Sequence, residues 1–245
     1  MSDLILKFFA KLLGHATPYI FSRFRFLYKK HFSGDFFSQT GLDKQLEKYL
    51  NYNDGFYVEL GANDGVTYSN SLYFELRRNW KGILVEPSPY QFLLCKERRS
   101  PKNHFFCNAC VSFDYKEKYV DFKYANLMSI SENLELDIDS KDSHINAGKK
   151  FLRGSETVFA FGALAKTLNS ILLESNAPLL IDFLSLDVEG AELEVLKGID
   201  FDKFSFKYML IEVRNLERMT SFLEPKGYIL KKQCSVSDYI FEYIK

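Results

Sequence analysis

The sequence predicts an α/β fold in which helices cover both faces of a mostly parallel sheet. From about residue 55 onward, short apolar runs alternate with segments of helical periodicity, a pattern typical of βαβ units. Several of these runs stop at a glycine or an acidic residue, so turn-forming and polar residues fall at strand ends, where open α/β sheets bind ligands. With 245 residues, 47% of them hydrophobic, the chain can bury the core that such a domain needs.

Each element follows from the pattern of its own residues. Strands are expected at 56–60, 83–85, 105–111, 183–186 and 208–213, with a final pair at 228–232 and 239–244. Helices are expected at 71–79, 90–98, 163–174, 191–197 and 216–223. The helix at 191–197 begins with acidic residues, which suit the positive end of a helix dipole, and Gly198 ends it.

The segment 114–154 interrupts this alternation. It is polar, acidic between Glu132 and Asp142, and without strong periodicity, and only 116–124 resembles a strand. A long loop inside a compact domain is commonly functional. We therefore expect an irregular acidic insertion, which is either a lid over a substrate or a solvated segment.

The net charge of zero conceals two unlike parts of the chain. Residues 1–32 contain six basic residues and one acid, so this segment carries +5 and the remainder −5. We interpret residues 1–39 as a basic, aromatic-rich helical arm and residues 40–245 as the folded domain. Because no basic patch continues into the acidic body, a nucleic-acid partner is not expected.

The arm itself suggests two kinds of contact. Residues 4–13 form an amphipathic helix if helical, and residues 19–32 mix aromatic with basic side chains, which suits an anionic membrane surface. The alternative is packing on the core or on a second subunit of a homo-oligomer. Basic residues interrupt the apolar ones, so neither a membrane span nor a clean signal peptide is predicted. We expect a cytoplasmic protein, with peripheral contact at the inner face of the membrane as the alternative.

Four cysteines are too few for a disulfide framework in a chain of this size, which fits a reducing compartment. Cys107 and Cys110 have C-x-x-C spacing. In a strand, however, these two positions point to opposite faces, and no second pair completes a zinc site. We expect free thiols here and assign no metal.

The first two strand ends carry a clear chemical signal. Glu59 stands at the end of the first strand, and Gly61 and Gly65 allow a tight turn and close approach of a ligand. Glu86 ends the second strand, near where a βαβ unit returns an acid to bind a ribose diol. A dinucleotide needs a phosphate-tolerant loop, which Asp64 disfavours, whereas S-adenosylmethionine is cationic at sulfur and nitrogen and has no phosphate. The acids therefore favour S-adenosylmethionine.

Two blocks of sequence resemble a known family. The first is VELGANDG at 58–65, followed by Ser69-Asn70 and by VEP at 85–87, and the second is IDFLSLDVEGAE at 181–192. Together, from about Phe56 to Tyr243, they resemble the FkbM-type methyltransferase family. The resemblance implies the class I methyltransferase (Rossmann-like) fold, a seven-stranded sheet with an antiparallel last strand, and S-adenosyl-L-methionine as cofactor. It also implies methylation of hydroxyl groups on sugars or secondary metabolites.

The resemblance assigns cofactor contacts to individual residues. The implied positions are Glu59, Gly61, Ala62, Asn63, Gly65 and Asn70 at the methionine and sulfonium end, Glu86 at the ribose, and Asn108 and Ala109 beside the adenine. The amide of Asn108 can both donate to and accept from a base edge. An equal alternative for Asn108 is capping of the turn after its strand.

Acidic residues near the methyl-donor position are candidates for catalysis. A hydroxyl must lose its proton as it attacks, so a carboxylate or histidine is expected as a base. Asp187 is the first candidate, then Glu189, then His144 from the insertion, and Glu212 completes a carboxylate cluster. Asp187, Glu189 and Glu212 also suit Mg²⁺, but their spacing is not a metal motif and no metal site is assigned. Alternatively, Glu189 stabilises a helix start and Glu212 pairs with a base such as Arg214.

The sequence thus predicts an S-adenosylmethionine-dependent methyltransferase that methylates a hydroxyl of a small molecule or saccharide. The alternative hypothesis, from a different functional class, is a non-catalytic family member that binds a partner through the arm and the acidic insertion. The intact set of Glu59, Gly61, Gly65 and Glu86 favours the enzyme.

Overall fold

The computed structural model describes residues 36–152, 154 and 156–245. Residues 37–245 form one compact unit, which includes a short bridge between Ser38 and Tyr68. The folded unit therefore starts a few residues before the expected boundary at 40. The expected helical arm lies, for its first 35 residues, outside the described residues, and so do the two alternatives for its contacts, packing on the core or a second subunit and peripheral membrane contact.

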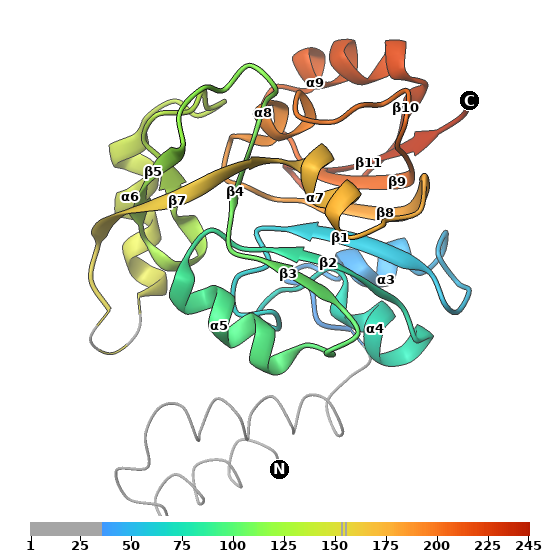
Figure 1. Cartoon of the computed structure of the whole chain (residues 1–245), viewed down its shortest axis with the longest axis horizontal. Helices are drawn as coiled ribbons and strands as arrows, with labels where there is room; N and C mark the ends of the chain where they lie inside the picture. Colours follow the sequence, from blue (N-terminus) through green and yellow to red (C-terminus); the bar gives the residue numbers. More distant parts are fainter. Residues whose placement is uncertain (1–35, 153, 155) are drawn as a thin grey trace, which may run out of the picture. The chain divides into compact units, whose positions relative to one another are not determined.

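A seven-stranded sheet in the order β10-β11-β9-β8-β1-β2-β3 organises the domain (Figure 1). Its strands are β1 (Phe56–Leu60), β2 (Lys81–Val85), β3 (His104–Phe106), β8 (Leu180–Leu186), β9 (Ser205–Glu212), β10 (Tyr228–Gln233) and β11 (Asp238–Tyr243). Only β11 runs antiparallel to its neighbours in this sheet, β9 and β10, and the remaining pairs are parallel. The predicted class I fold, with seven strands and an antiparallel last strand, is confirmed.

Short helices connect the strands, and in Figure 1 α7 is drawn in front of the sheet and α3 behind it. The helices are α3 (Leu42–Leu46), α4 (Leu72–Arg78), α5 (Pro89–Arg98), α6 (Lys141–Gly148), α7 (Leu168–Glu174), α8 (Glu192–Leu196) and α9 (Leu216–Leu223), with 3-10 turns η1 (Asn126–Met128), η2 (Lys149–Phe151) and η3 (Glu224–Lys226). Side-chain caps fix the starts of α7 and α9, where Thr167 and Asn215 accept hydrogen bonds from backbone amides one turn later.

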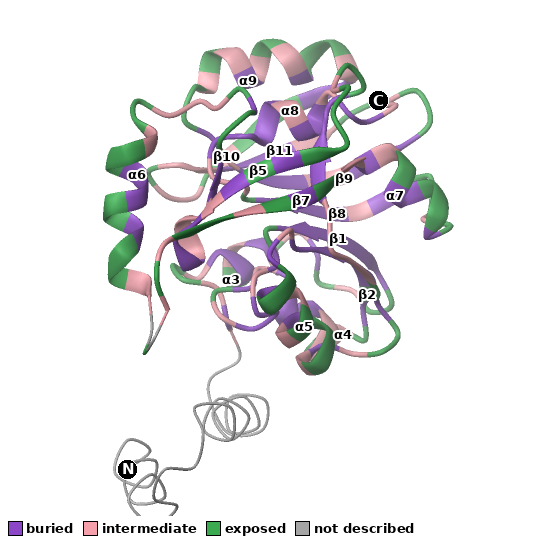
Figure 2. Cartoon of the chain, turned by 60° about the vertical axis from the view of Figure 1, so that its left-hand side comes forward, coloured by how far each residue is buried: buried purple, intermediate pink, exposed green. Residues whose placement is uncertain are grey.

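The core lies along the central strands, which are buried on both faces (Figure 2). All five residues of β1 are buried, and no alternation of polar and apolar residues appears there. This is the pattern of a parallel strand covered on both faces, and it explains why the strands read as continuous apolar runs in the sequence. The carboxyl ends of β1, β2, β8 and β9 therefore meet at one edge of a rigid sheet.

A second sheet differs from the sequence prediction. We call it the cap sheet; its strands, in the order β4-β7-β5-β6, are β4 (Ala109–Val111), β5 (Tyr119–Tyr124), β6 (Ile130–Ser131) and β7 (Phe159–Thr167). The single strand expected at 105–111 divides into β3 and β4, and the helix expected from 163 begins only at Leu168. Residues 163–167 pair with β4 and β5 instead, so strand pairing overrides a local pattern that suits a helix.

The insertion at 114–154 is not irregular, contrary to the prediction. It contains β5, η1, β6, α6 and η2, and Ser140 caps the start of α6. Arg218 on α9 binds Asp137 and Glu135 at 2.7 and 2.6 Å, which fastens the acidic stretch to the main domain. Whether the insertion acts as a lid stays a prediction.

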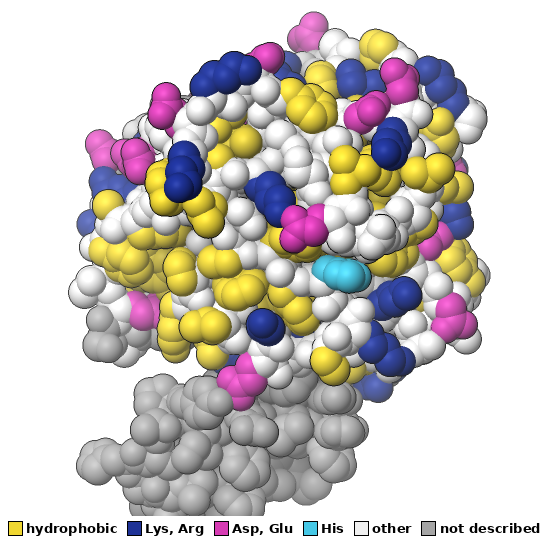
Figure 3. All heavy atoms as spheres, viewed as in Figure 1, with side chains coloured by type: hydrophobic (Ala, Val, Ile, Leu, Met, Phe, Trp, Pro, Cys, Tyr) yellow, Lys and Arg dark blue, Asp and Glu magenta, His cyan; other side chains and the backbone are white. Residues whose placement is uncertain are grey.

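The surface of the cap sheet and α5 exposes several large apolar side chains. They are Tyr90, Leu93, Tyr119, Phe159 and Leu164, each with at least 45% of its surface exposed. Figure 3 shows hydrophobic side chains spread over the face that carries these elements. Among the described helices, none is long and apolar enough to cross a membrane.

Candidate functional site

A cavity of about 400 Å³ opens at the carboxyl ends of β1, β2, β8 and β9, and the cap sheet borders it. Its volume falls within the range of pockets for small ligands. Many of the predicted site residues line it, namely Gly61, Asn63, Glu86, Asn108, Ala109, Asp187, Glu189 and Glu212. Of the remaining predicted residues, Glu59, Ala62, Gly65, Asn70 and His144 do not line it. The fold thus gathers two distant sequence blocks around one cavity.

The glycine of the first turn is required by the close approach of two strand ends. Gly61 has φ +76, and a Cβ at this position would lie 2.0 Å from the carbonyl oxygen of Asp187. Any larger residue would push β1 and β8 apart or strain the backbone. The next loop residue in the left-handed region, Asn63, donates its backbone N–H to Glu86 at 2.8 Å. The loop is therefore fixed against both neighbouring strands.

Glu86 presents a buried carboxylate to the cavity. Its two oxygens accept backbone hydrogen bonds, Oε2 from Asn63 at 2.8 Å and Oε1 from Ser88 at 2.9 Å. Burial raises the pKa of Glu86 to about 7, against the lowering effect of these two hydrogen bonds. A carboxylate oxygen has further lone pairs, so both oxygens can still accept hydroxyl groups of a ligand.

Glu59 does not reach the cavity, contrary to the prediction. It is 4% exposed and accepts hydrogen bonds from Ser69, Asn70 and Ser71. It also forms an ion pair with Arg99 at 3.1 Å. Its capacity as an acceptor is used inside the protein. Glu59 therefore holds the segment before α4 and cannot contact a ligand directly.

Arg99 is the centre of this buried network and was missed by the sequence analysis. Its guanidinium, fully enclosed, also binds Glu75 at 2.9 Å, the carbonyl oxygen of Gly65 at 3.0 Å and the hydroxyl of Tyr57 at 2.8 Å. Arg99 lies just after the end of α5, outside both sequence blocks, so no local sequence pattern indicated that it is buried and pairs with Glu59. It ties α5 to the loop after β1.

Three further predicted residues support the loop without facing the cavity. Ala62 is buried, Gly65 has φ +78 and packs against α5, and the Asn70 side-chain amide donates to Ser185 at 3.1 Å.

Asp64 also does not line the cavity. Its carboxylate binds Arg98 at 2.6 Å and the backbone N–H of Thr67 at 2.7 Å, so the expected repulsion of a phosphate by Asp64 is wrong.

Asp187, at the end of β8, faces the cavity with a carboxylate that accepts no hydrogen bond among the described residues. It is exposed to the cavity and otherwise enclosed by protein. Burial in this surrounding, together with the carboxylates of Glu189 and Glu212, raises its pKa well above the ordinary value. A carboxylate that faces a cavity and has a raised pKa is a candidate for a general base.

Glu189 joins the insertion to the end of β9. Its Oε2 lies 2.9 Å from Nε2 of His144 on α6, although the angle is not that of a hydrogen bond, and 3.3 Å from the guanidinium of Arg214. The backbone of Glu189 has φ +58, which is costly for a residue with a side chain. The predicted pair of Glu212 and Arg214 is present at 3.1 Å.

Glu192 belongs to this acidic group although it was expected only to stabilise a helix start. Its Oε1 accepts the backbone N–H groups of Val188 and Gly190, and burial raises its pKa to about 7. Asp187, Glu192 and Glu212 each place a carboxylate oxygen within 4.8 Å of the others. Glu189, which was expected in such a trio, turns instead to His144 and Arg214. The backbone hydrogen bonds give Glu192 a structural role, and acids alone do not define a metal site.

Asn108 lies between the two sheets and borders the cavity. Its side-chain nitrogen donates to the carbonyl oxygen of Leu164 on β7 at 3.1 Å. Because a carbonyl can only accept, this bond fixes the orientation of the amide and leaves Oδ1 as an acceptor. The side chain of Asn108 therefore has a structural role, because it links the turn after β3 to β7, and it also keeps an oxygen that can accept a hydrogen bond.

The strand order and the cavity at the strand ends define a methyltransferase-type α/β protein. The family model described as "Methyltransferase FkbM domain" matches residues 59–230, and the chain belongs to this family of S-adenosylmethionine-dependent methyltransferases. No curated protein matches the chain in sequence. Membership of the family establishes methyl transfer as the class of activity, but it does not determine the substrate.

Solved structures resemble the chain only remotely. A human methyltransferase 10 domain containing protein is 12% identical, with 89% of this chain and 91% of that chain covered and a TM-score of 0.44. A putative caffeoyl-CoA O-methyltransferase from Staphylococcus aureus is 11% identical, with 98% and 100% covered and a TM-score of 0.43. TrmK from M. capricolum, in complex with S-adenosyl-homocysteine, is 10% identical, with 84% and 68% covered and a TM-score of 0.41.

The cavity residues fit the cofactor of this family. Glu86 offers two carboxylate oxygens for a ribose diol, and Asn108 offers an acceptor for a base. The pKa values of Asp187 and Glu212 are raised by burial and by repulsion between carboxylates, and a cation placed among these acids relieves that repulsion. A sulfonium and an ammonium group meet this demand, whereas the pyrophosphate of a dinucleotide does not.

Proposed function

We propose that this protein transfers a methyl group from S-adenosylmethionine to a hydroxyl oxygen of a sugar or a small metabolite. The observation that carries the proposal is the position of Asp187, whose free carboxylate faces the cavity at the end of β8 with a raised pKa. A hydroxyl acceptor needs such a base, because the oxygen loses its proton as it attacks. The cofactor supplies an electrophilic methyl group on a sulfonium.

The other acidic residues fit supporting roles better than the role of base. The guanidinium of Arg214 lies 3.3 Å from Glu189 and 3.1 Å from Glu212, so both carboxylates already have a cationic partner, whereas Asp187 has none among the described residues. His144 does not line the cavity and can act only through Glu189. We therefore retain Asp187 as the catalytic base and treat His144 as a positioning residue.

Alignment of the two reactants is the second requirement of an in-line displacement. The loop after β1 is held by Glu86 on one side and by the end of β8 on the other, so its geometry does not depend on a bound ligand. Glu86 receives the ribose diol in this account. The buried Arg99 also holds this loop, because its guanidinium donates a hydrogen bond to the carbonyl oxygen of Gly65.

The substitution Asp187→Asn tests the assignment of the base. It keeps the size of the side chain and removes its basicity, so turnover should fall by about 10²- to 10⁴-fold. Binding of S-adenosylhomocysteine, whose sulfur is neutral, should change little. The measurement is methyl transfer from labelled cofactor to a panel of sugars and hydroxylated metabolites, with products identified by mass spectrometry.

Asn169→Asp is a suitable control because Asn169 lies on α7, outside the cavity. It should keep the activity of the unmodified protein. Unchanged turnover in Asp187→Asn would remove Asp187 from the mechanism. Methylation of amines or thiols, but of no hydroxyl, would overturn the proposed acceptor class while leaving the methyltransferase assignment intact.

A further inference from the structure

Two residues with a strained backbone lie at the cavity. Non-glycine residues rarely adopt positive φ values, and asparagine and aspartate tolerate them best. Among the described non-glycine residues with positive φ, all are asparagine or aspartate except Tyr68, with φ +59, and Glu189, with φ +58. Both of these exceptions line the cavity. Because strain of this kind persists mainly at functional sites, Tyr68 is a candidate for a role that the proposed mechanism does not yet include.

Buried groups fix the backbone on both sides of Tyr68. The hydroxyl of Thr67 donates to Asp64 Oδ2 at 2.8 Å, and the hydroxyl of Ser69 donates to Glu59 Oε1 at 2.9 Å. Each of these two carboxylates also pairs with an arginine at the end of α5. The chain before and after Tyr68 is therefore anchored to buried ion pairs, which hold Tyr68 in its strained conformation.

The side chain of Tyr68 is open to the cavity. It is 43% exposed, and within the described part of the chain it makes no hydrogen bond, ion pair or aromatic contact. A tyrosine that stabilises the fold by packing is covered, as Tyr57 and Tyr228 are. The fold thus fixes the position of Tyr68 and leaves both its ring and its hydroxyl available to a ligand.

A free amide lies beside this ring. Ser38 forms a parallel bridge with Tyr68, and its hydroxyl donates to the buried carboxylate of Asp43 at 2.7 Å. Gln39 follows, lines the cavity, and has a side-chain amide without a hydrogen bond to any described residue. One peptide unit and one bridge join the two positions, so the Cα atoms of Gln39 and Tyr68 lie within about 9 Å of each other.

A ring beside an amide matches the chemistry of a sugar. The face of an aromatic ring is partly negative, and the C–H groups of a sugar, each next to an oxygen, are partly positive, so the two stack on each other. The hydroxyl groups at the edge of the sugar need donors and acceptors, and an amide offers both.

The exposure of Gln39 and Tyr68 distinguishes them from the candidates for cofactor binding. Both residues are exposed, whereas Glu86, the candidate for the ribose, is buried. The ring and the amide therefore lie at the solvent side of the cavity. A methyl acceptor enters the cavity from that side.

We propose that Tyr68 and Gln39 bind the methyl acceptor, and that this acceptor is a saccharide whose ring stacks on Tyr68. The inference rests on the proposed function, because it selects sugars among the hydroxyl compounds and names the residues that hold them. It also extends the role of the Glu59 network, which fixes the segment that carries Tyr68.

Methyl-transfer kinetics of the full chain test this inference. The probes are the methyl glycosides of glucose, galactose, mannose and rhamnose, with catechol as a flat hydroxyl compound, at saturating labelled S-adenosylmethionine. At least one glycoside should be methylated. For that glycoside, Tyr68→Ala should raise the KM by about tenfold or more and change kcat by less than about threefold, since the ring binds ground and transition states alike. Tyr68→Phe keeps the ring, and its KM should stay within about threefold of the original.

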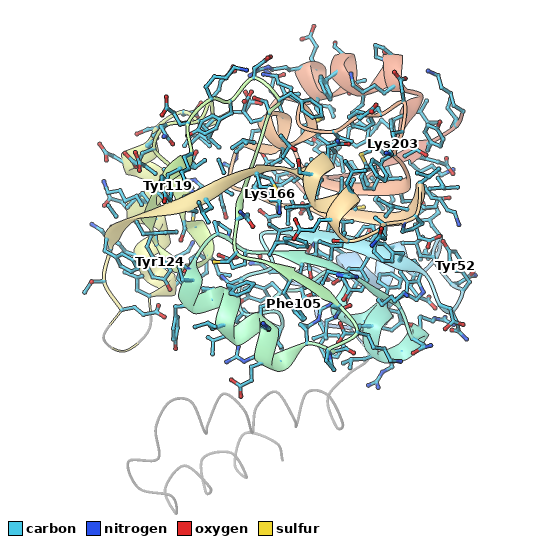
Figure 4. All side chains as sticks on the ribbon, in the orientation of Figure 1. Tyr52, Phe105, Tyr119, Tyr124, Lys166 and Lys203 are labelled. Atoms are coloured by element: carbon cyan, nitrogen blue, oxygen red, sulfur yellow. The ribbon has the colours of Figure 1, made fainter. Side chains whose placement is uncertain are left out.

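Tyr119→Ala is the matched control for the loss of an exposed ring. Tyr119, which Figure 4 labels on β5, is 49% exposed but does not line the cavity, so its removal should leave the KM unchanged. Gln39→Ala should raise the KM by about three- to tenfold. Neither Gln39→Ala nor Tyr68→Ala should alter the affinity for S-adenosylhomocysteine in titration calorimetry.

Tyr68→Gly separates binding from a structural role. Glycine adopts a positive φ without strain, which offsets its greater freedom in the unfolded chain. The Tm of the apo protein should therefore be unchanged or higher, while the KM rises as in Tyr68→Ala. A Tm that falls by several degrees with an unchanged KM would assign Tyr68 to the structure and overturn the inference.

Failure of this inference is distinguishable from failure of the proposed function. Binding of S-adenosylhomocysteine without methylation of any glycoside, or equal KM values in Tyr68→Ala and Tyr119→Ala, would overturn the inference, and so would a tenfold loss of S-adenosylhomocysteine affinity in Tyr68→Ala. None of these results contradicts methyl transfer to another hydroxyl compound. Absence of S-adenosylhomocysteine binding to the unmodified protein would overturn the proposed function, and the inference with it.

Discussion

Two groups of carboxylates lie near the same edge of the sheet, and they differ in how their charge is balanced. Glu59, at the end of β1, is surrounded by Arg99 and by hydroxyl and amide donors that use its oxygens. Asp187, at the end of β8, has neighbours of its own charge and no hydrogen-bond donor among the described residues. The charge of Glu59 is balanced within the protein, and that of Asp187 is not.

This difference shows that a position at a strand end does not by itself make a carboxylate functional. A buried charge is tolerated when partners compensate it, and such a group stabilises structure. A charge left without compensation next to a cavity is compensated by what binds there. The Glu59 group is therefore expected to govern stability, and the Asp187 group to govern ligand binding and catalysis.

The largest effect on stability is expected from Arg99→Met. Loss of the guanidinium leaves Glu59 and Glu75 buried without their cation, which should lower the free energy of unfolding by about 3–5 kcal/mol. Chemical denaturation followed by circular dichroism measures this change. The control Arg78→Met removes a partly exposed pair with Glu47 and should cost at most about 1 kcal/mol.

The double substitution Arg99→Met/Glu59→Gln sharpens this test. Removing the uncompensated charge should restore part of the lost stability, and the coupling appears in a double-mutant cycle. A loss in Arg99→Met no larger than in Arg78→Met would contradict the view of this group as the balanced one.

A smaller effect is expected from pH. Burial raises the pKa of Glu86 and of Glu192 from 4.5 in the unfolded chain to about 7, so the folded protein binds more protons than the unfolded chain between these values. Their contribution to stability is complete below about pH 4.5 and is lost as the pH rises through about 7. A pKa difference of one corresponds to about 1.4 kcal/mol, and a domain of this size shifts its Tm by about 2–4 °C per kcal/mol. The Tm of the apo protein should therefore fall by several degrees between pH 6 and 8.

Glu192→Gln should flatten this dependence, because glutamine keeps the acceptor for Val188 and Gly190 without the charge. The control is Glu242→Gln. A hydrogen bond from Lys231 lowers the pKa of Glu242, so its titration lies below the measured interval and the slope should not change. A Tm that rises between pH 6 and 8 in the unmodified protein would show that the acidic group is compensated after all.

The main sheet could be predicted from the sequence because each central strand is a buried apolar run with a turn signal at its end. The same holds for the cavity residues Gly61, Glu86 and Asp187, since the topology brings the carboxyl ends of β1, β2 and β8 together. Local pattern and global fold agree at these positions.

The cap sheet and the buried network could not be predicted in this way. Residues 163–167 include alanine and leucine, which favour helices, yet they pair with strands that are distant in the sequence. Glu59 and Asp64 carry the expected chemistry, but Arg99 and Arg98, from the far end of α5, turn it inward. Ion pairs between distant segments leave no signal in the sequence around either partner.

The most direct test of this account is titration calorimetry of the full chain with S-adenosylmethionine and, separately, with NAD at pH 8. The group of carboxylates around Asp187 should accept the cationic cofactor but not the pyrophosphate, because a cation relieves the repulsion among these acids and an anion adds to it. We expect one molecule of S-adenosylmethionine bound per chain and no binding of NAD. Binding of NAD, or no binding of S-adenosylmethionine, would contradict the account.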